Sequence, residues 1–361
     1  MPIVFLIFFF ISLQAAMAQD FFNFQKSSDH VNNVILSADG GIEWDKDKNN
    51  LTGFGNSILS RGNMTLKSQE TLRLFSKPES TNHKTKIDRV VAKTSALLTT
   101  DKILASADKI EMLFSADRFY KNDEVVKRIN FFNRAKIIAK KNNNNDMILY
   151  ANRASGYRYK KSKIILAKFN PRNFNKNPFA ELEATGAVKI NEQTFDAKGN
   201  RLIWFFDDNI GWLYGREVVV ITKKNKTSDK QNIIYAKKLL EYNEGESWAR
   251  AKNGVRIITK KKETIIGRRG YYFPLKDMFV ICGKVSLTRL NKKGQRETIK
   301  GQCANSDLKT GISHIEGRNL EKSMLKIVGA DNLLPKTKTL KKLNNQPLDN
   351  RGRVRAIINL E

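Results

Sequence analysis

Residues 265–317 decide the fold, and they read IIGRRGYYFPLKDMFVICGKVSLTRLNKKGQRETIKGQCANSDLKTGISHIEG. Apolar residues alternate with polar or charged residues in short runs, of which Val285-Ser286-Leu287-Thr288 is the clearest. This alternation is the period of a half-buried β-strand, in which successive side chains point to opposite faces. The segment Asn291-Lys292-Lys293-Gly294 interrupts the alternation with residues typical of a turn. The stretch therefore predicts a β-hairpin centred on this turn.

A short signature recurs along the whole chain: an apolar residue, any residue, and then Ala. Most successive copies lie roughly 30–45 residues apart, and self-similarity at such a period is typical of stacked repeats. Residues 86–140 would also suit a helix, because Ala, Leu, Lys and Glu are common there, but the embedded signature favours strands. Short strands at regular spacing predict an all-β protein. Copies of the signature start at Leu36, Ile103, Ile137, Leu149, Phe195 and Ile234, and variants with Ser or Gly in place of Ala start at Leu66, Ile265 and Ile299.

Composition divides the chain into blocks. Pro171 and Pro178 stand in an Asn/Pro-rich stretch, whereas proline is sparse in the strand regions because it cannot donate a ladder hydrogen bond. We therefore predict an N-terminal β-repeat block over 34–168, a linker over 169–179 and a C-terminal block over 180–320. Residues 321–361 are rich in Lys and Asn, which predicts a basic, largely flexible tail with one short strand at 353–358.

The first residues predict export. Residues 2–13 form an apolar run that is shorter than the roughly 20 residues a membrane-spanning helix needs. Ala16-Met17-Ala18 follows, with the small residues that signal peptidase requires. We predict a signal peptide over 1–18, cleavage after Ala18, and a secreted or periplasmic mature protein. No Lys or Arg precedes the apolar run, so an uncleaved membrane anchor is the alternative.

The chain is strongly basic, with 65 Lys and Arg residues, 36 Asp and Glu residues and a formal net charge of +29. A positive field of this size favours phosphate-rich partners such as nucleic acid, anionic membranes or phosphorylated glycolipids. Export makes nucleic acid the less available of these, so we expect no nucleic-acid partner. A codon bias toward Lys, Asn and Ile also contributes to this composition.

The sequence contains no constellation of residues that would support catalysis. The three histidines, His30, His83 and His314, do not stand in a zinc-ligand spacing with a second His or Cys. Neither a GxSxG nucleophile motif nor a phosphate-cradling GxxxxGK[ST] motif is present. We therefore expect no catalytic residues, no metal site and no cofactor, and we predict that the protein is not an enzyme.

Two cysteines, Cys282 and Cys303, flank the predicted turn. An even count in an oxidising compartment is compatible with a disulfide. A register that faces Leu287 with Ile299 puts the two sulfurs one residue out of line, and such a slip moves side chains to opposite faces. The sequence leaves the disulfide open.

The pattern within 283–317 resembles the OstA/LptA family, periplasmic proteins that carry lipopolysaccharide between two bacterial membranes. A glycine and Val-Ser-Leu-Thr precede a charged turn, and Ile-Lys-Gly, Asp-Leu-Lys-Thr-Gly and Ile-Glu-Gly follow it. The resemblance is clearest over 180–320 and weaker over 34–170. It implies an all-β, elongated open β-jelly roll of stacked short antiparallel strands. Because the chain is longer than the usual single-domain member, two tandem rolls or a fused partner domain within 34–168 are both open.

The resemblance also implies a function without a cofactor. The ligand would be lipopolysaccharide, with its acyl chains shielded in an apolar groove and the phosphates of lipid A paired with basic residues. The partners would be an inner-membrane-anchored protein and an outer-membrane component, with end-to-end self-association through unpaired strands. The protein would be periplasmic and would help to bridge the inner and outer membranes.

The alternating runs supply candidate groove residues, for which packed core is the plainer interpretation. They are Val188, Ile190, Trp204, Val255, Ile257, Val285, Leu287 and Ile299. Other functions fit the same pattern. One is an outer-membrane β-barrel, whose strands also alternate. Another is a secreted basic β-repeat protein that binds polyanions with an affinity that falls steeply with salt. A structural surface protein built of β repeats is the third.

Overall fold

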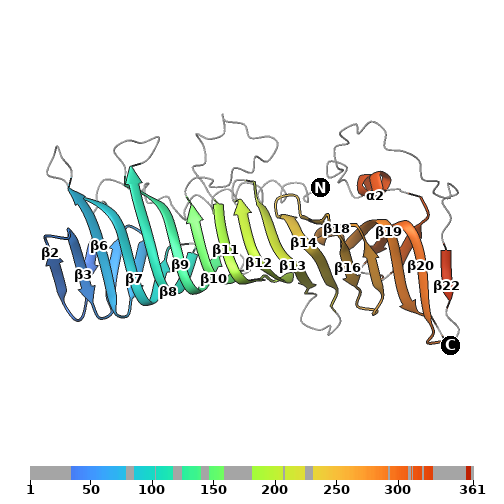
Figure 1. Cartoon of the computed structure of the whole chain (residues 1–361), viewed down its shortest axis with the longest axis horizontal. Coiled ribbons are helices and arrows are strands. Elements are labelled where there is room, and N and C mark those ends of the chain that lie inside the picture. The colour runs from blue at the N-terminus through green and yellow to red at the C-terminus, as the bar shows by residue number, and fades with distance from the viewer. Residues whose placement is uncertain are drawn as a thin grey trace, which may run out of the picture. The chain divides into compact units, whose positions relative to one another are not determined.

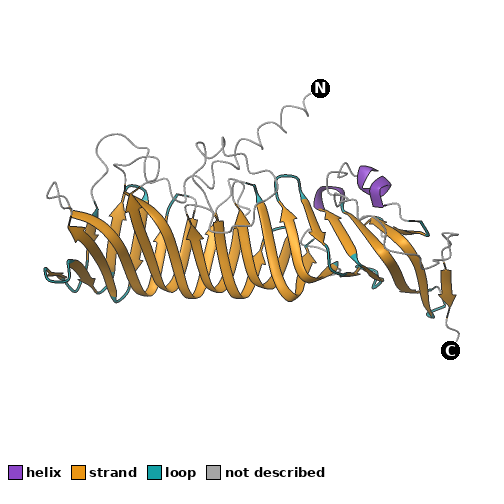
Figure 2. Ribbon diagram, turned by 45° about the horizontal axis from the view of Figure 1, so that its top comes forward, coloured by secondary structure: helices purple, strands orange, loops and turns teal. Residues whose placement is uncertain are grey.

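The computed structural model consists almost entirely of antiparallel β-strands, which confirms the predicted all-β fold class (Figure 2). The structure describes residues 34–78, 85–101, 103–116, 124–139, 146–157, 181–205, 208–223, 231–291, 293–307, 310, 312–318, 321–327 and 355–358. The chain divides into two compact units: Met1–Gln193 with Asn200–Gly211, and Thr194–Gly199 with Trp212–Glu361. We call them unit 1 and unit 2, and each is described by itself.

The strands of unit 1 are antiparallel; the first five have three to five residues, as the sequence predicts, whereas β7 to β11 have 11 to 16 residues. Figure 1 shows β2, β3, β6, β7, β8, β9 and β10 as successive neighbours. The strands are β1 (Ile35–Ser37), β2 (Ile42–Asp45), β3 (Asn50–Phe54), β4 (Ser57–Arg61), β5 (Met64–Ser68), β6 (Thr71–Pro78), β7 (Thr85–Thr99), β8 (Ile103–Ala116), β9 (Glu124–Ala139), β10 (Met147–Tyr157) and β11 (Glu181–Asn191). Strands β12 (Phe195–Phe205) and β13 (Ile210–Thr222) have residues in both units.

A line of bends divides the strands of unit 1 into two layers. Each of the long strands β7 to β11 contributes one segment to either layer, and the short strands before them form pairs that are joined at the same line. Layer A contains β1, β4 and β5 and residues 96–99, 103–107, 135–139, 147–151 and 188–191. Layer B contains β2, β3 and β6 and residues 85–93, 109–116, 124–132, 153–157 and 181–185.

Positive backbone φ angles produce these bends. Thr94 and Ser95 in β7 have φ angles of 62° and 51°, and they lie opposite the single residue Asp108 of β8. A second pair with positive φ, residues 133–134 of β9, lies opposite the single residue Asn152 of β10. Two residues opposite one form a β-bulge, which kinks a strand and increases its local twist. We call this row of positions the bend line of unit 1; it also includes residues 55–56, 69–70 and 186–187.

Unit 2 has the same two-layer plan. Layer A contains β16, β17 and β22 and residues 233–236, 285–290 and 296–301; layer B contains β15, β18 and β21 and residues 240–243, 278–282 and 303–307. The strands are β14 (Ile233–Asn243), β15 (Trp248–Ala251), β16 (Val255–Ile258), β17 (Thr264–Gly267), β18 (Arg269–Phe273), β19 (Met278–Leu290), β20 (Arg296–Asp307), β21 (Ile312–Glu316) and β22 (Arg355–Ile358). The short helices are η2 (Pro274–Lys276) and α2 (Glu321–Ile327). The bend line of unit 2 consists of residues 237–239, 252–254, 268, 283–284 and 302.

The bend between β19 and β20 answers the question that the sequence left open about the two cysteines. Leu287 does face Ile299, but Gly283 and Lys284 together lie opposite the single residue Gln302. This bulge absorbs the one-residue mismatch, so Cys282 pairs directly with Cys303 on the other side of the bend. The two cysteines form a disulfide.

Helix α2 covers an apolar cluster on the outer face of layer B in unit 2. Met324 and Leu325 of the helix are 6% and 0% exposed. The cluster consists of Trp248, Tyr271, Phe273, Val280, Cys282, Cys303, Met324 and Leu325. Residues 321–327, which lie within the predicted basic tail, form this helix because Glu321, Met324 and Leu325 are buried on one of its faces. The short strand expected at 353–358 corresponds to β22, which pairs with β20.

The two units divide the chain further along than the predicted blocks do. Strand β11 pairs with β10 of unit 1, although residues 181–191 were assigned to the predicted C-terminal block. The predicted signal peptide, residues 1–18, and the predicted linker, residues 169–179, lie outside the described residues. Among the helices that the structure describes, none has the length and apolar character needed to cross a membrane.

Candidate functional site

The inner face of unit 1 is formed by apolar side chains that lie opposite one another from strand to strand. One row crosses layer A: Leu36, Leu59, Leu66, Leu98, Ala105, Ile137, Leu149 and Ile190. A second row crosses layer B: Trp44, Leu51, Leu74, Val90, Met112, Ile129, Gly156 and Leu182. Most members of these rows are buried, but Trp44 at the start of the second row is 66% exposed. The apolar face therefore continues to the edge strand β2.

The inner face of unit 2 has corresponding rows. In layer A, Ile234, Ile257, Ile265, Leu287 and Ile299 lie opposite one another in that order. In layer B, the corresponding row is Tyr242, Ala249, Tyr272, Phe279 and Ser306. The Tyr272 and Phe279 rings are stacked with their centroids 4.6 Å apart, and burial raises the pKa of Tyr272 to about 12. This phenol is therefore neutral at physiological pH.

Next to the bend line, the two layers of unit 2 are packed too closely for an additional atom. A Cβ built on Gly267 in layer A would lie 2.4 Å from Cγ2 of Ile281 in layer B. A Cβ on Gly270 in layer B would lie 2.7 Å from Cγ1 of Val255 in layer A. Glycine is needed at both positions because it permits this close approach. The space that can adapt to a ligand therefore lies in the rows further from the bend.

Polar contacts connect the two layers of unit 2 at the strand ends away from the bend, which we call the rim of unit 2. Lys261 Nζ donates a hydrogen bond to the Thr310 carbonyl at 3.1 Å. The Ser313 hydroxyl donates to a Glu263 carboxylate oxygen at 3.4 Å. The first contact is exposed and the second is partly buried, and polar contacts with such access to solvent exchange readily with water. They can open without disrupting the apolar rows.

The structure separates the predicted groove residues into three sets. Val188 and Ile190 lie on the inner face of β11 in unit 1, and Trp204 is buried in β12, with its ring over Gly211. Ile257, Leu287 and Ile299 belong to one row of unit 2, in which Ile299 is half-buried. Val255 and Val285 are buried beside the bend line of unit 2. Their role in ligand binding stays a prediction.

Sequence reasoning missed the apolar residues of unit 1 that contribute most to its inner face. Met112, Ile129 and Phe131 are completely buried. At each bulge, the set of side chains that points inward shifts by one residue along the strand. In β8, Ala105 and Ala107 point inward before the bend, and Ile110 and Met112 point inward after it. Uninterrupted alternation cannot follow such a change, but a search for two alternating runs that are offset by one residue would have found it.

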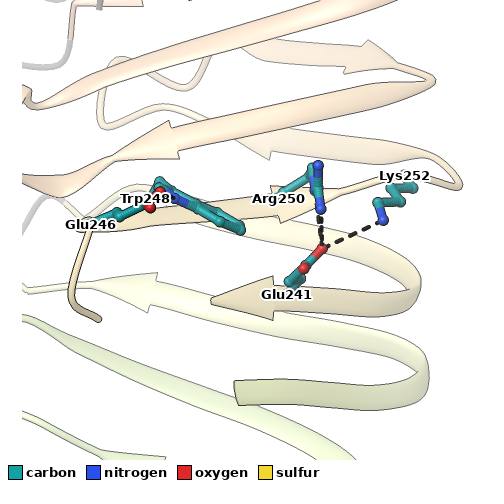
Figure 3. A network of polar contacts seen from close by, with 5 residues as sticks. All are labelled: Glu241, Glu246, Trp248, Arg250 and Lys252. Atoms are coloured by element: carbon teal, nitrogen blue, oxygen red, sulfur yellow. Dashed lines mark hydrogen bonds and ion pairs between the residues drawn. The ribbon is translucent and has the colours of Figure 1, made fainter. Parts of the chain in front are cut away.

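A charged network lies on the outer face of layer B in unit 2 (Figure 3). Arg250 Nη2 lies 2.6 Å from Glu241 Oε2, and Lys252 Nζ lies 3.5 Å from the same oxygen. The Trp248 indole N–H donates to Glu246 at 2.7 Å. Arg250 and Glu241 are largely buried, so their charges compensate each other within the protein. This network leaves little free charge on layer B itself.

Helix α2 is tied to the same outer face by Glu321. Arg269 Nε and the Tyr271 hydroxyl each donate to Glu321 Oε1 at 2.8 Å. Burial, and secondarily the hydrogen bond to this carboxylate, raises the pKa of Tyr271. The hydrogen bond to Glu321 also raises the pKa of Arg269. The disulfide and the helix thus reinforce the outer face and leave the inner face unobstructed.

The solved structures that match the chain include a periplasmic protein. The crystal structure of LptH, the LptA homologous periplasmic component of the lipopolysaccharide transport device from Pseudomonas aeruginosa, matches 59% of this chain and 95% of its own. The sequence identity is 9% and the TM-score is 0.21. No family model and no curated protein matches the chain.

Proposed function

We propose that the protein is a non-catalytic, periplasmic carrier that binds the acyl chains of lipopolysaccharide on its inner faces. The observation that carries this proposal is the set of apolar rows that run across successive strands on the inner face of each unit. Such a surface offers an acyl chain one apolar contact per strand, and each buried methylene contributes about 0.8 kcal/mol. The resemblance of residues 283–317 to the OstA/LptA pattern supports the same ligand class.

Acyl chains would bind between the outer rows of unit 2 rather than beside the bend. The row that contains Ile257, Leu287 and Ile299 lies further from the bend than the tightly packed glycines, so lipid can replace contacts between the layers there. Entry requires the rim contacts of Lys261 and Ser313 to open. Basic residues at the rim then lie near the phosphates of the lipid head, which Lys pairs as a point charge.

Edge strands support end-to-end partners, the second element of the proposal. Ile35 and Ile42 are 64% and 50% exposed, and Trp44 is exposed beside them. Among the described strands, β1 pairs with β4 and β2 pairs with β3, each along one edge. An exposed apolar edge is a template for strand addition. Another roll of this kind, in a second copy or in membrane-bound components of the same bridge, would extend the apolar rows.

Photo-crosslinking with purified lipopolysaccharide tests the proposal. A photoreactive residue at Leu287 should label lipid strongly, one at Val285 beside the bend weakly, and one at Ser286 on the opposite face should not label it. Ile190 and Lys189 form the matched inner and outer pair in unit 1. Equal labelling on both faces, or none at Leu287 and Ile190 in correctly folded variants, would refute the proposal.

A further inference from the structure

The bend line of unit 2 carries a row of basic residues on its exposed surface. Lys237 and Lys238 lie at the bend of β14, Arg268 lies between β17 and β18, and Lys284 lies at the bend of β19. All four side chains are exposed. We call these four residues the basic ridge.

Backbone hydrogen bonds show that the positions of the basic ridge are consecutive. The Lys237 N–H donates to the Gly254 carbonyl at 2.9 Å, and the Gly254 N–H donates to the Arg268 carbonyl at 2.8 Å. The Arg268 N–H in turn donates to the Gly283 carbonyl at 3.1 Å. Neighbouring strands are about 4.8 Å apart, so the ridge presents its cations along a nearly straight line at a spacing of one or two strands.

Glycines on the bend line position the stems of two of these side chains. A Cβ on Gly254 would lie 3.6 Å from Cβ and 3.9 Å from Cδ of Lys237. A Cβ on Gly283 would lie 3.0 Å from Cβ and 3.4 Å from Cδ of Arg268. Each stem therefore lies over the glycine of the next bend. The charged ends extend along the ridge into solvent, as long cationic side chains do when their stems are packed.

The charge of the basic ridge is not compensated within the described protein. None of its four residues forms an ion pair with a described carboxylate, whereas Lys252 on the neighbouring bend shares Glu241 with Arg250. The bend line of unit 1 differs, because its cation Arg134 lies 2.6 Å from Asp108. Its other bend positions include Thr94, Ser95 and Asn152, which are uncharged. A bend of this kind therefore does not require exposed cations.

We propose that the basic ridge docks unit 2 onto an anionic lipid membrane. The ridge lies along the outside of a bend, so it can touch a planar surface along its whole length but cannot enclose a small ligand. Each Lys or Arg that lies near the lipid phosphates of such a surface raises the partition coefficient of the protein onto the membrane roughly fivefold. Contact through the bend line leaves the inner face and the rim of unit 2 free, and it does not depend on the proposed lipopolysaccharide function.

The test compares two variants that remove the same charge. The ridge variant K237Q/K238N/R268Q/K284N uses Asn at the two positions with positive φ, where Asn is tolerated. The control variant K261Q/K262N/K293Q/R296Q replaces four exposed basic residues at the strand ends of unit 2 away from the bend, with Asn at Lys262 because its φ is positive. Full-length chains are sedimented with vesicles of phosphatidylcholine alone or with 30% phosphatidylglycerol, at low and high salt. The ratio of binding to the two vesicles cancels any contribution of the apolar N-terminal run, which all chains share.

We expect the wild type to prefer anionic vesicles, and the ridge variant to lose that preference by roughly a hundredfold or more at low salt. The control variant should lose this preference by a factor at least about tenfold smaller than the ridge variant does, because charges more than about 10 Å from the docked surface are screened. Three outcomes would overturn the proposal: no preference in the wild type, equal losses in both variants, or a ridge variant that keeps its vesicle preference but loses binding to inorganic polyphosphate. The last outcome would assign the ridge to a soluble polyanion.

Discussion

The bends of unit 1 and unit 2 use the same backbone solution with different side chains. Thr94 and Ser95 in unit 1, and Gly283 and Lys284 in unit 2, have positive φ and lie opposite a single residue of the next strand. Unit 1 bends without a disulfide, while unit 2 has the Cys282–Cys303 disulfide beside its bend. Backbone geometry alone can therefore turn these strands. The side chains of the bend are free to carry stabilising bonds or charge.

The inner faces, in contrast, are expected to be equivalent in the two units. Phe131 in unit 1 and Phe279 in unit 2 are both almost completely buried. We expect Phe131→Ala and Phe279→Ala each to lower the stability of its own unit by about 3–5 kcal/mol, the usual cost of a large apolar truncation. Native-state hydrogen exchange of β9 and β19 measures the two losses separately.

Phe132→Ala is the matched control for this pair of variants. Phe132 is adjacent to Phe131 but half-buried on the opposite face, where Lys109 Nζ lies 4.6 Å from its ring centroid. Its replacement should cost about 1 kcal/mol, because it removes a partly exposed ring and one cation–π contact. If Phe132→Ala and Phe131→Ala were equally destabilising, the assignment of inner and outer faces in unit 1 would be incorrect.

The disulfide should matter only to unit 2. We expect the double variant Cys282→Ser/Cys303→Ser to destabilise unit 2 by about 2–4 kcal/mol, because the cross-link closes a loop and so restricts the unfolded chain. Exchange of β19 and β20 should accelerate, while that of β7 and β8 stays unchanged. Reduction of the wild type under the same conditions should reproduce the effect. Faster hydrogen exchange in unit 1 would contradict this prediction, because it would mean that the disulfide also stabilises unit 1.

The sequence predicted the strands and the turn around Asn291 because these features depend on local alternation and turn residues. The register that faces Leu287 with Ile299, one that the sequence allows, is the register of the structure. The sequence did not predict that Cys282 faces Cys303, because a single bulge decides this and its φ angles depend on the neighbouring strand. The glycine at 283 was the available signal, since glycine inside an alternating run often marks a bulge.

The helix at residues 321–327 could not be predicted from the sequence for a different reason. Glu321, Met324 and Leu325 follow the spacing of one helical face, but the Lys- and Asn-rich residues after them dominate the composition of the segment. Only seven residues form the helix, and so short a helix depends on tertiary packing. Its partners Arg269 and Tyr271 lie about fifty residues earlier in the chain. No local pattern could reveal that contact.

The Glu321 contacts give the third comparison, since none of the strands described in unit 1 is covered by such a helix. Replacing Glu321 with Ala leaves the hydrogen-bonding groups of Arg269 and Tyr271 without this acceptor, and Arg269 is only partly screened by solvent. We expect a loss of about 1–3 kcal/mol in unit 2. Lys322→Ala, at an exposed position of the same helix, should have almost no effect. The tyrosine absorbance titration should move to lower pH in E321A, because the carboxylate that raises the Tyr271 pKa is gone.

The smallest effect concerns the backbone of the bends themselves. Thr94 has a φ of 62°, which is unfavourable for a β-branched residue, whereas Lys284 has a φ of 55° and is not branched. Asn tolerates this region better, and Thr94 accepts the Gln69 N–H through its backbone carbonyl, which the substitution keeps. We therefore expect Thr94→Asn to stabilise unit 1 by about 0.5–1 kcal/mol and Lys284→Asn to change unit 2 by less than about 0.5 kcal/mol. Hydrogen exchange of β7 and β19 measures both effects. Destabilisation by Thr94→Asn would mean that its side chain supports the bend, and the bends of unit 1 would then depend on more than backbone geometry.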